Sequence, residues 1–262
     1  MTGVRFVRFT VADRIAYGVV DGDGDDQSAL TVTAIDGHPF APYERTQAVF
    51  PLTEVRLLPP VLPSKVIGVG KNYADHAAEM GGTAPATPVV FLKPSTAIVG
   101  DAEAILLPGQ SAQVEHEGEL AVVIGRLARE VPESRVADVV LGYSCANDVT
   151  ARDLQHSDGQ WTRAKGFDSF CPLGPWIATG VDPTDLAVET RVNGQLRQSG
   201  RTSQMVHSVS DLVQFVSSVM TLLPGDVILT GTPAGVGPLV DDDTVTVTVE
   251  NVGTLTNHVV RP

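Results

Sequence analysis

The sequence predicts an α+β fold dominated by strands, with a few helices and a small β unit at the N-terminus. Most apolar runs are about four to eight residues long, rich in Val, Ile and Thr, and bounded by Gly, Pro or Asp, which is typical of buried strands. Few segments show helical spacing. With 262 residues, of which 43% are hydrophobic, the chain is long enough to form a full core.

The first 58 residues predict a small N-terminal β domain. The stretch VRFVRFTVADRIAYGVV alternates in the manner of two strands, and ALTVTAIDG follows as another. A proline-rich segment, LLPPVLPSK at residues 57–65, then indicates a boundary. We therefore expect a second, larger domain over residues 59–262.

The larger domain combines many short strands with three helices. We expect helices at residues 72–80, around 149–159, and at 209–220, where Leu212, Phe215, Val216 and Met220 fall at helical spacing. In the first of these helices, Asn72 is a candidate N-cap, and Gly81 and Gly82 can end it. The expected strands lie at residues 65–70, 89–94, 104–108, 119–125, 138–148, 187–195, 226–231 and 244–260.

Charge and composition exclude several classes of function. The formal net charge is −13 and the pI is near 4.7, whereas nucleic-acid binding needs clustered Lys and Arg. The apolar runs are too short to span a bilayer, and arginines interrupt the only apolar stretch near the N-terminus. The two cysteines form no CxxC pair. We expect a cytoplasmic protein that binds neither nucleic acid nor membrane.

Three glutamates alternate at the start of one buried strand. In VEHEGELAVVIG, Glu115, Glu117 and Glu119 would share one side of an extended chain. Two carboxylates about 4 Å apart repel by roughly 4 kcal/mol at an effective dielectric constant near 20, so we expect a positive charge beside them. Spacing places Glu117 and Glu119 nearest the buried end, but leaves the ligand set open.

Asp148 offers another carboxylate, because it ends the apolar run in GYSCANDVTARD. The alternative interpretation is an N-cap for the helix that follows. A set of ligands made only of carboxylates favours a hard cation such as Mg²⁺, Mn²⁺ or Ca²⁺.

Two further elements suggest acid–base chemistry. His76 and Glu79 are three residues apart on a predicted helix, and a glutamate beside an imidazole fixes its tautomer and raises its basicity. The alternative is an ordinary exposed helix face. Lys165 follows Trp161 and precedes Phe167 and Phe170, an apolar setting that favours a lysine directed into a pocket.

From about residue 60 to the end, the chain contains, in order, GVGKNYADHAAEM, VVFLKPSTAIVG, VEHEGELAVVIG, GYSCANDVTARDLQ, GQWTRAKGFDSFCPLGPW, VNGQLRQSG and MTLLPGDVILTGTPAGVGP. In these segments and their order the chain resembles the fumarylacetoacetate hydrolase family. It is greatest to bacterial members labelled 2-hydroxyhepta-2,4-diene-1,7-dioate isomerase or oxaloacetate decarboxylase. The resemblance implies a mixed β-sandwich roll over residues 59–262, a homodimer, and Mg²⁺ or Mn²⁺ as cofactor, with Ca²⁺ as a further option.

The same resemblance implies roles for individual residues. The metal ligands would be Glu117, Glu119 and Asp148, so that Glu115 is not a ligand. The catalytic residues would be His76, Glu79 and Lys165, and the substrate-binding residues would be Gly231 and Thr232 of the TGTP loop, Lys71 and Gln155, with Thr232 at the carboxylate end of the substrate. Relatives often have Arg at the position of Lys71, and Arg grips a carboxylate bidentately whereas Lys does not.

The implied activity is a metal-dependent reaction of small 2-oxo or 2-hydroxydienoic dicarboxylic acids through an enolate held by the metal. We expect an isomerase or a 2-oxo-acid decarboxylase of aromatic-compound catabolism. The alternative is a C–C bond hydrolase of the acylpyruvate or fumarylacetoacetate type. A non-catalytic protein with a structural cation is a third hypothesis, but such a cation needs neither the His76–Glu79 pair nor Lys165.

Overall fold

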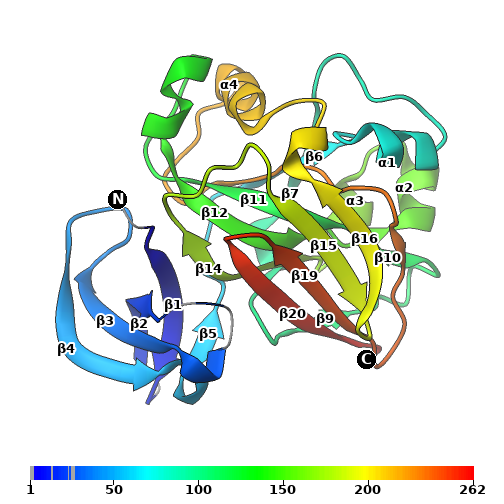
Figure 1. The fold of residues 1–262 in the computed structure, drawn as a ribbon. Coiled ribbons are helices and arrows are strands. Elements are labelled where there is room, and N and C mark those ends of the chain that lie inside the picture. Colours follow the sequence, from blue (N-terminus) through cyan, green and yellow to red (C-terminus); the bar gives the residue numbers. More distant parts are fainter. Residues whose placement is uncertain (1–2, 13, 23, 25–26) are drawn as a thin grey trace.

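The computed structural model describes residues 3–12, 14–22, 24 and 27–262, and its architecture is dominated by strands (Figure 1). The strands are β1 (Arg5–Val11), β2 (Arg14–Asp21), β3 (Thr31–Gly37), β4 (Tyr43–Pro51), β5 (Arg56–Leu58), β6 (Val66–Gly70), β7 (Val89–Lys93), β8 (Ile98–Val99), β9 (Ala104–Leu106), β10 (Val114–His116), β11 (Gly118–Ile124), β12 (Val140–Asn147), β13 (Thr150–Ala151), β14 (Cys171–Ala178), β15 (Ala187–Val192), β16 (Gln195–Arg201), β17 (Val227–Leu229), β18 (Gly237–Pro238), β19 (Thr244–Val249) and β20 (Gly253–Val260). The α-helices are α1 (Ala74–Glu79), α2 (Arg152–Asp158), α3 (Thr162–Lys165) and α4 (Val209–Val219). Short 3₁₀ turns are η1 (Gln27–Ala29), η2 (Leu52–Glu54), η3 (Ser95–Ala97), η4 (Glu133–Asp138) and η5 (Thr202–Gln204).

The strands form a long sheet and two smaller ones. The long sheet has the order β4-β3-β2-β1-β14-β12-β11-β17-β6-β7, with β5 paired to β1 and β8 to β14. A second sheet has the order β16-β15-β19-β20-β9, and a third is β13-β10-β18. Buried side chains of the long sheet (Leu120, Val122) share one hydrophobic cluster with side chains of the second (Val188, Val247, Leu255). This packing of sheet on sheet confirms the predicted strand-dominated sandwich.

The predicted small N-terminal β unit is present and consists of β1 to β5, which lie to one side of the main body in Figure 1. It is joined to the main body by hydrogen bonding between strands, since β1 pairs with β14 through Arg5↔Ala178 and Phe6↔Ile177. The division after residue 58 lies at the end of β5 and stays a prediction.

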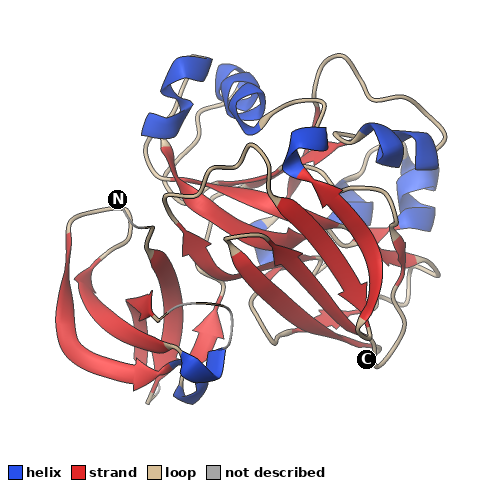
Figure 2. Cartoon of the chain, in the orientation of Figure 1, coloured by secondary structure: helices blue, strands red, loops and turns tan. Residues whose placement is uncertain are grey.

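Each of the three predicted helices occurs, and they lie at the edge of the strands (Figure 2). In α4 the predicted apolar face is real, because Leu212 and Val216 are fully buried. Its start is capped by Ser208, whose hydroxyl accepts a hydrogen bond from the Asp211 amide. None of the helices in the described residues combines the length and the hydropathy needed to span a bilayer.

Four expectations about local structure were wrong. Residues 244–260 are not one strand but a hairpin of β19 and β20. Residues 187–195 are not one strand, because the chain turns at Asn193 and Gly194, both at positive φ, and returns as β16. Asn72 does not cap α1, since its amide donates to the carbonyls of His207 and Thr230. The glutamate stretch is not one continuous strand but two, β10 and β11.

The interruption between β10 and β11 falls at Glu117. β10 belongs to the three-stranded sheet and β11 to the long sheet, so the chain passes from one sheet to another at this residue. β11 pairs with β12 from Gly118↔Asn147 onward. The end of β12 therefore lies beside the start of β11, and the Asp148 amide donates to the Glu117 carbonyl at 2.8 Å.

Candidate active site

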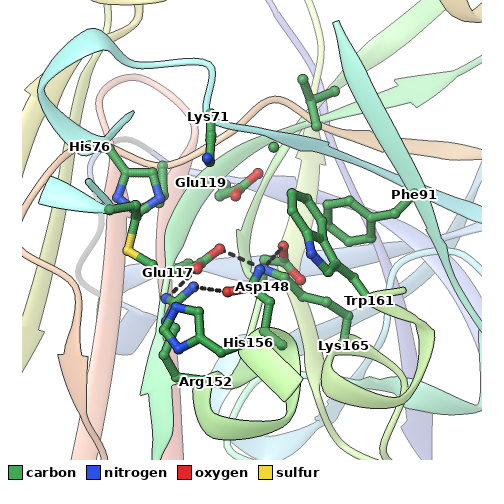
Figure 3. A pocket seen from close by; sticks show the side chains of 15 residues that line it. Lys71, His76, Phe91, Glu117, Glu119, Asp148, Arg152, His156, Trp161 and Lys165 are labelled. Atoms are coloured by element: carbon green, nitrogen blue, oxygen red, sulfur yellow. Dashed lines mark hydrogen bonds and ion pairs between the residues drawn. The ribbon is translucent and has the colours of Figure 1, made fainter. Parts of the chain in front are cut away.

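A pocket with a volume of ≈ 250 Å³ opens at this junction between the sheets (Figure 3). Most of the predicted site residues line it, although they come from segments far apart in the sequence. The lining consists of Val69, Gly70, Lys71, His76, Met80, Phe91, Glu117, Glu119, Asp148, Arg152, Gln155, His156, Trp161, Lys165 and Thr232.

Three carboxylates meet in this pocket. Glu117, Glu119 and Asp148 are each at most 4% exposed, and one oxygen atom from each lies within 4.8 Å of the others. The antiparallel pairing of β11 with β12 explains why residues about thirty positions apart converge. The predicted ligand set is therefore brought together.

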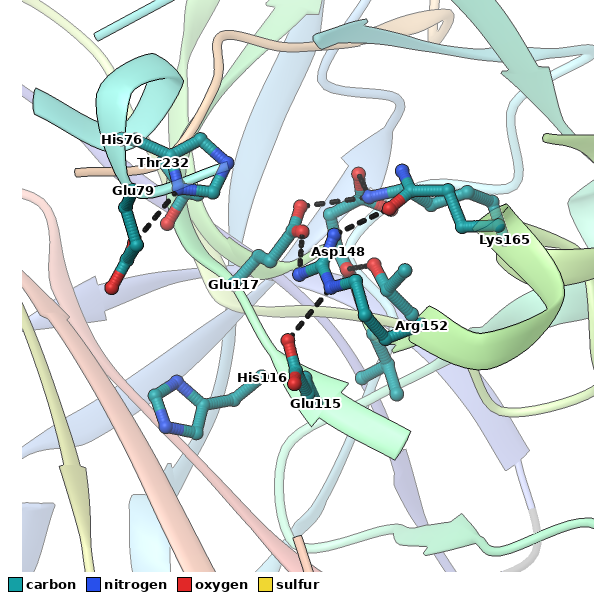
Figure 4. A network of polar contacts seen from close by, with 12 residues as sticks. His76, Glu79, Glu115, His116, Glu117, Asp148, Arg152, Lys165 and Thr232 are labelled. Carbon is teal, nitrogen blue, oxygen red and sulfur yellow. Dashed lines mark hydrogen bonds and ion pairs between the residues drawn. The ribbon is translucent and has the colours of Figure 1, made fainter. Parts of the chain in front are cut away.

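Buried cations hold two of the three carboxylates (Figure 4). Lys165 Nζ donates to Glu117 Oε2 at 2.7 Å and to Asp148 Oδ2 at 2.6 Å. Arg152 Nη2 donates to Glu117 Oε1 at 2.5 Å, and Lys93 Nζ donates to Asp148 Oδ1 at 2.5 Å. The expectation of positive charge beside the glutamates is thus met by side chains of the protein itself.

Lys165 is one of the residues predicted from the sequence, whereas Arg152 and Lys93 are not. A signal for Lys93 existed, because it sits inside the apolar run VVFLKP, where a lysine needs a buried partner. Arg152 comes four residues after Asp148, at the start of α2, and is only 3% exposed.

Glu119 differs from the other two carboxylates. Among the described residues no Lys or Arg forms an ion pair with it, and its Oε2 accepts a hydrogen bond from the Gly231 amide at 2.7 Å. Burial, together with the negative charges of Asp148 and Glu117, raises the pKa of Glu119 well above its usual value. The positive charge of Lys165 lowers the pKa of Glu119 but does not outweigh these effects.

Glu117 shows the opposite behaviour. Burial tends to raise its pKa, but the positive charges of Lys165 and Arg152 outweigh burial and hold the pKa of Glu117 well below the usual range. Each carboxylate oxygen that accepts one hydrogen bond keeps a second lone pair. The three side chains therefore fit a hard divalent cation, which would supply the charge that Glu119 lacks.

Two alternatives left open by the sequence are decided by these contacts. Glu115 lies outside the three-carboxylate group and pairs instead with Arg152 Nε at 2.7 Å. Asp148 is not an N-cap, because α2 begins at Arg152 with Ala151 in the capping position.

His76 lies on another wall of the same pocket, whereas Glu79, which contacts His76, is not part of the lining. His76 Nδ1 is 3.2 Å from Glu79 Oε2, and His76 is only 5% exposed. Glu79 also accepts a hydrogen bond from the Gly235 amide at 3.1 Å, which ties α1 to the loop after β17. For His76, the alternative of an exposed helix face is therefore wrong.

Not all of the residues predicted to bind substrate line the pocket. Lys71 and Gln155 line the pocket, and Gln155 Oε1 accepts from Arg152 Nη1 at 2.6 Å. Thr232 also lines it, but its hydroxyl already donates to the Gly118 carbonyl and accepts from Gln198 Nε2. Gly231 is not part of the lining, since its amide is directed at Glu119.

Comparison with models of protein families gives a match for each of the two parts of the chain. The family model described as "Fumarylacetoacetate (FAA) hydrolase C-terminal" matches residues 65–260. The model described as "Rv2993c-like, N-terminal" matches residues 4–60.

Individual relatives cover from about four fifths to nearly all of the chain. A solved structure of 2-hydroxyhepta-2,4-diene-1,7-dioate isomerase from Mycobacterium marinum is 53% identical, covers 98% of both chains and has a TM-score of 0.93. A maleylpyruvate hydrolase from Sphingobium sp. SYK-6, solved with manganese(II) and pyruvate, is 33% identical, covers 98% of this chain and 99% of its own, and has a TM-score of 0.80. The mitochondrial oxaloacetate tautomerase Fahd2a of Rattus norvegicus is 44% identical over 81% of this chain and 72% of its own.

Proposed function

The chain belongs to the fumarylacetoacetate hydrolase family, and from its pocket we propose that it is a divalent-cation-dependent isomerase that interconverts keto and enol forms of small 2-oxo or 2-hydroxydienoic dicarboxylic acids. The observation that carries this proposal is that the buried carboxylate cluster and His76, which is held by Glu79, line one pocket.

Glu117, Glu119 and Asp148 would hold Mg²⁺ or Mn²⁺. Such a cation supplies Lewis-acid stabilisation of the negative charge that develops on the keto oxygen of a 2-oxo acid. The manganese(II) and pyruvate bound to the maleylpyruvate hydrolase support this choice of ions and of ligand.

We assign the proton transfer to His76. Its Nδ1 is held by Glu79, which leaves Nε2 as the nitrogen able to exchange a proton with a substrate.

Lys165 suits a different role. Burial tends to lower the pKa of Lys165, but Asp148 and Glu117 outweigh burial and raise that pKa, so the ammonium group stays protonated. It therefore acts as a proton donor or a fixed positive charge rather than as a base.

Charged groups elsewhere on the pocket wall suit an anionic substrate. Arg152 and Lys71 supply positive charge for the carboxylates of a dicarboxylic acid, and Gln155 orients the Arg152 guanidinium. Decarboxylation of a β-carboxylate would use the same electron sink. A homodimer, a cytoplasmic location and a role in aromatic catabolism stay predictions.

A second candidate is hydrolysis of a carbon–carbon bond. It is favoured by the His76–Glu79 pair, which is suited to activating a water molecule, and by the similarity to maleylpyruvate hydrolase. Hydrolysis requires an activated water molecule, whereas decarboxylation requires none.

The test is a substrate panel assayed with Mg²⁺ or Mn²⁺. Oxaloacetate, 2-hydroxyhepta-2,4-diene-1,7-dioate and an acylpyruvate are followed by the loss of enol absorbance and by analysis of products. We expect enol–keto conversion of the dicarboxylates and its abolition by EDTA. Turnover of none of these compounds would contradict the enzyme proposal, and EDTA that lowers only the Tm would favour a structural cation.

The products formed by the wild-type protein separate the two candidates, and the His76→Ala variant tests whether His76 takes part in the reaction. It should keep Mn²⁺ binding but slow both proton transfer and hydrolysis by about 10²-fold or more, the usual contribution of a general base. Products of C–C cleavage formed by the wild-type protein and lost in the variant would favour the hydrolase.

A further inference from the structure

Glu79, the partner of His76, is only weakly fixed by its own helix. Its side chain is 33% exposed, and α1, which carries it, is six residues long, so both depend on contacts with the rest of the fold. Among the described residues, the polar partners of its carboxylate are His76 Nδ1 and the amide of Gly235. The Gly235 amide is thus the contact that can fix the direction of Glu79 toward His76.

The Gly235 amide contacts both oxygens of the Glu79 carboxylate. Its nitrogen lies 3.1 Å from Oε1 and 3.2 Å from Oε2, and Oε2 is also the atom that contacts His76 Nδ1 at 3.2 Å. A carboxylate only accepts hydrogen bonds, so a neutral His76 donates from Nδ1 and leaves Nε2 without a proton. The amide, the carboxylate and the imidazole therefore form one chain of hydrogen bonds.

The backbone at Gly235 suits glycine alone. Its φ is +101°, a conformation that residues with a side chain rarely adopt. A Cβ atom at this position would lie 2.1 Å from the Arg197 carbonyl oxygen of β16. A residue with a side chain would therefore push the amide away from Glu79.

The loop that carries Gly235, residues 230–235, is attached to β16 at further points. Gln198, which is fully buried, donates from Nε2 to the Pro233 carbonyl at 2.7 Å. Pro233 also packs directly on Gly200, where a Cβ atom would lie 2.6 Å from the Pro233 Cβ. Strand β16 thus sets the position of the Gly235 amide, although none of its described residues lines the pocket.

We propose that Gly235 is a positioning residue whose amide holds Glu79 against His76 and so fixes the tautomer of the base. This inference rests on the proposed function, because it assumes that His76 exchanges a proton at Nε2. When Glu79 turns away, the neutral imidazole can carry its proton on Nε2 instead, and that nitrogen then cannot accept one. Gly235 does not line the pocket and acts only through Glu79.

The experiment records the tautomer of His76 by ¹⁵N NMR of the Mg²⁺-loaded protein with labelled histidine, and His76→Ala identifies the signal. The spectra are taken at pH 8.5, well above the usual titration range of imidazole. In the wild-type protein we expect a single form with the proton on Nδ1. A wild-type protein with the proton on Nε2, or with both forms, would overturn the proposal.

The Gly235→Ala variant moves the amide and should give a mixture of the two tautomers. In the same variant kcat should fall by about tenfold or more, while KM stays within about twofold, because Glu79 and Gly235 do not line the pocket. A folded Gly235→Ala protein with the wild-type tautomer would overturn the proposal.

A second variant displaces the loop from β16 instead. The Cβ of Gly200→Ala would press on Pro233 without touching Glu79, so this variant should also give a mixture of tautomers. It decides the question if Gly235→Ala does not fold, and an unchanged tautomer would then count against the proposal.

Gly194→Ala is the matched control. It places a Cβ at a φ of +76° in the turn between β15 and β16, with no atom of the described residues within 4 Å. It should lower the Tm through backbone strain and leave the tautomer of His76 unchanged. An equal change of tautomer in this control would overturn the proposal. The tautomer is read without turnover, so a protein inactive on the substrate panel would contradict the proposed function while this experiment still decides the role of Gly235.

Discussion

At the scale of single residues, the pocket owes its character to the unequal environments of three carboxylates. Two lysines and an arginine contact Asp148 and Glu117, whereas Glu119 receives only the Gly231 amide among the contacts of the described residues. A buried carboxylate without a cation is destabilising, and the raised pKa of Glu119 reflects that cost. Glu119 is thus the residue that gains most from a bound cation.

Replacing Glu119 by Gln therefore has two expected effects. Mn²⁺ affinity should fall by about a hundredfold or more, since losing even an outer partner of a metal ligand costs about 10–100-fold, and turnover should fall with it. The Tm of the metal-free protein should stay equal or rise, because Gln removes a buried charge. Because the pKa of Glu119 is raised in the folded state, the wild-type protein loses stability as the pH rises and Glu119 gives up its proton. The Tm of the variant should therefore exceed that of the wild-type protein by a growing margin toward pH 8.

Calorimetric Mn²⁺ titration and thermal unfolding check both effects. Glu189→Gln, which alters an exposed ion pair with Arg191, is the matched control and should change neither quantity. A Glu119→Gln variant that binds Mn²⁺ as tightly as the wild-type protein would place the ligand set elsewhere.

At the scale of elements, the site depends on where strands end. Glu117 lies between β10 and β11, and Asp148 directly follows β12. At strand ends the backbone leaves the regular ladder, so neighbouring side chains can converge on one point. The ladder between β11 and β12 fixes the register of the two strands and with it the distance between the carboxylates.

The turn before β17 shows how a buried charge is stabilised elsewhere in the fold. Asp226 is 0% exposed. Its Oδ1 accepts from the Ser64 amide and hydroxyl and from the Lys65 amide, and its Oδ2 accepts from the Leu223 amide and the Lys65 ammonium. Burial alone would raise the pKa of Asp226, but these hydrogen bonds and the charge of Lys65 lower it. They connect this turn to the segment that leads into β6.

Asp226→Asn should destabilise the protein by about 3 kcal/mol at pH 7, because the amide NH₂ that replaces Oδ2 would face two donors. Since the pKa of the folded state is lowered, the stability that Asp226 contributes is present above the unfolded value of about 3.9 and is lost as the pH falls through the folded value. Urea unfolding should therefore show a constant difference between wild type and variant from about pH 5 to 8 and convergence in acid. Asp36→Asn, at an exposed position, is the control, and a difference that does not shrink in acid would contradict the assignment.

At the scale of the whole molecule, the N-terminal unit and the main body share a hydrophobic core. Val7 and Phe9 of β1 belong to the same buried cluster as Leu120 of β11 and Trp176 of β14. Arg5 also lies over the Trp176 ring, 5.0 Å from its centroid. The pairing of β1 with β14 makes the connection continuous across the long sheet.

We therefore expect the whole chain to unfold in one cooperative calorimetric transition. Phe9→Ala, which opens a cavity in the shared cluster at a cost of about 3–5 kcal/mol, should lower the Tm of that single transition without splitting it. Tyr43→Ala, at a half-buried position of the same unit, should have a smaller effect. Two separate transitions in the wild-type protein would show that the units fold independently.

Much of this architecture could be predicted from local patterns. The helical spacing of Leu212 and Val216 is a local pattern, and it predicts a helix without any information about residues remote in sequence. The same holds for the short β-branched strands. The hairpin of β15 and β16 differs from the single strand predicted over residues 187–195, although the Asn193-Gly194 dipeptide within it is a turn signal.

Local patterns in the sequence predict that carboxylates gather near one strand, that His76 and Glu79 are neighbours on a helix, and that a positive charge lies close to the glutamates. These conclusions follow from spacing along the chain and from electrostatic repulsion. The fold, in contrast, sets which side chains provide this charge, namely Lys93, Arg152 and Lys165. It leaves Glu119 with a hydrogen bond from the Gly231 amide but with no ion pair to a Lys or Arg of the described residues. The physical reason is that ion pairing depends on distances of a few ångströms between residues remote in sequence, which are set by strand register and by the break between two sheets.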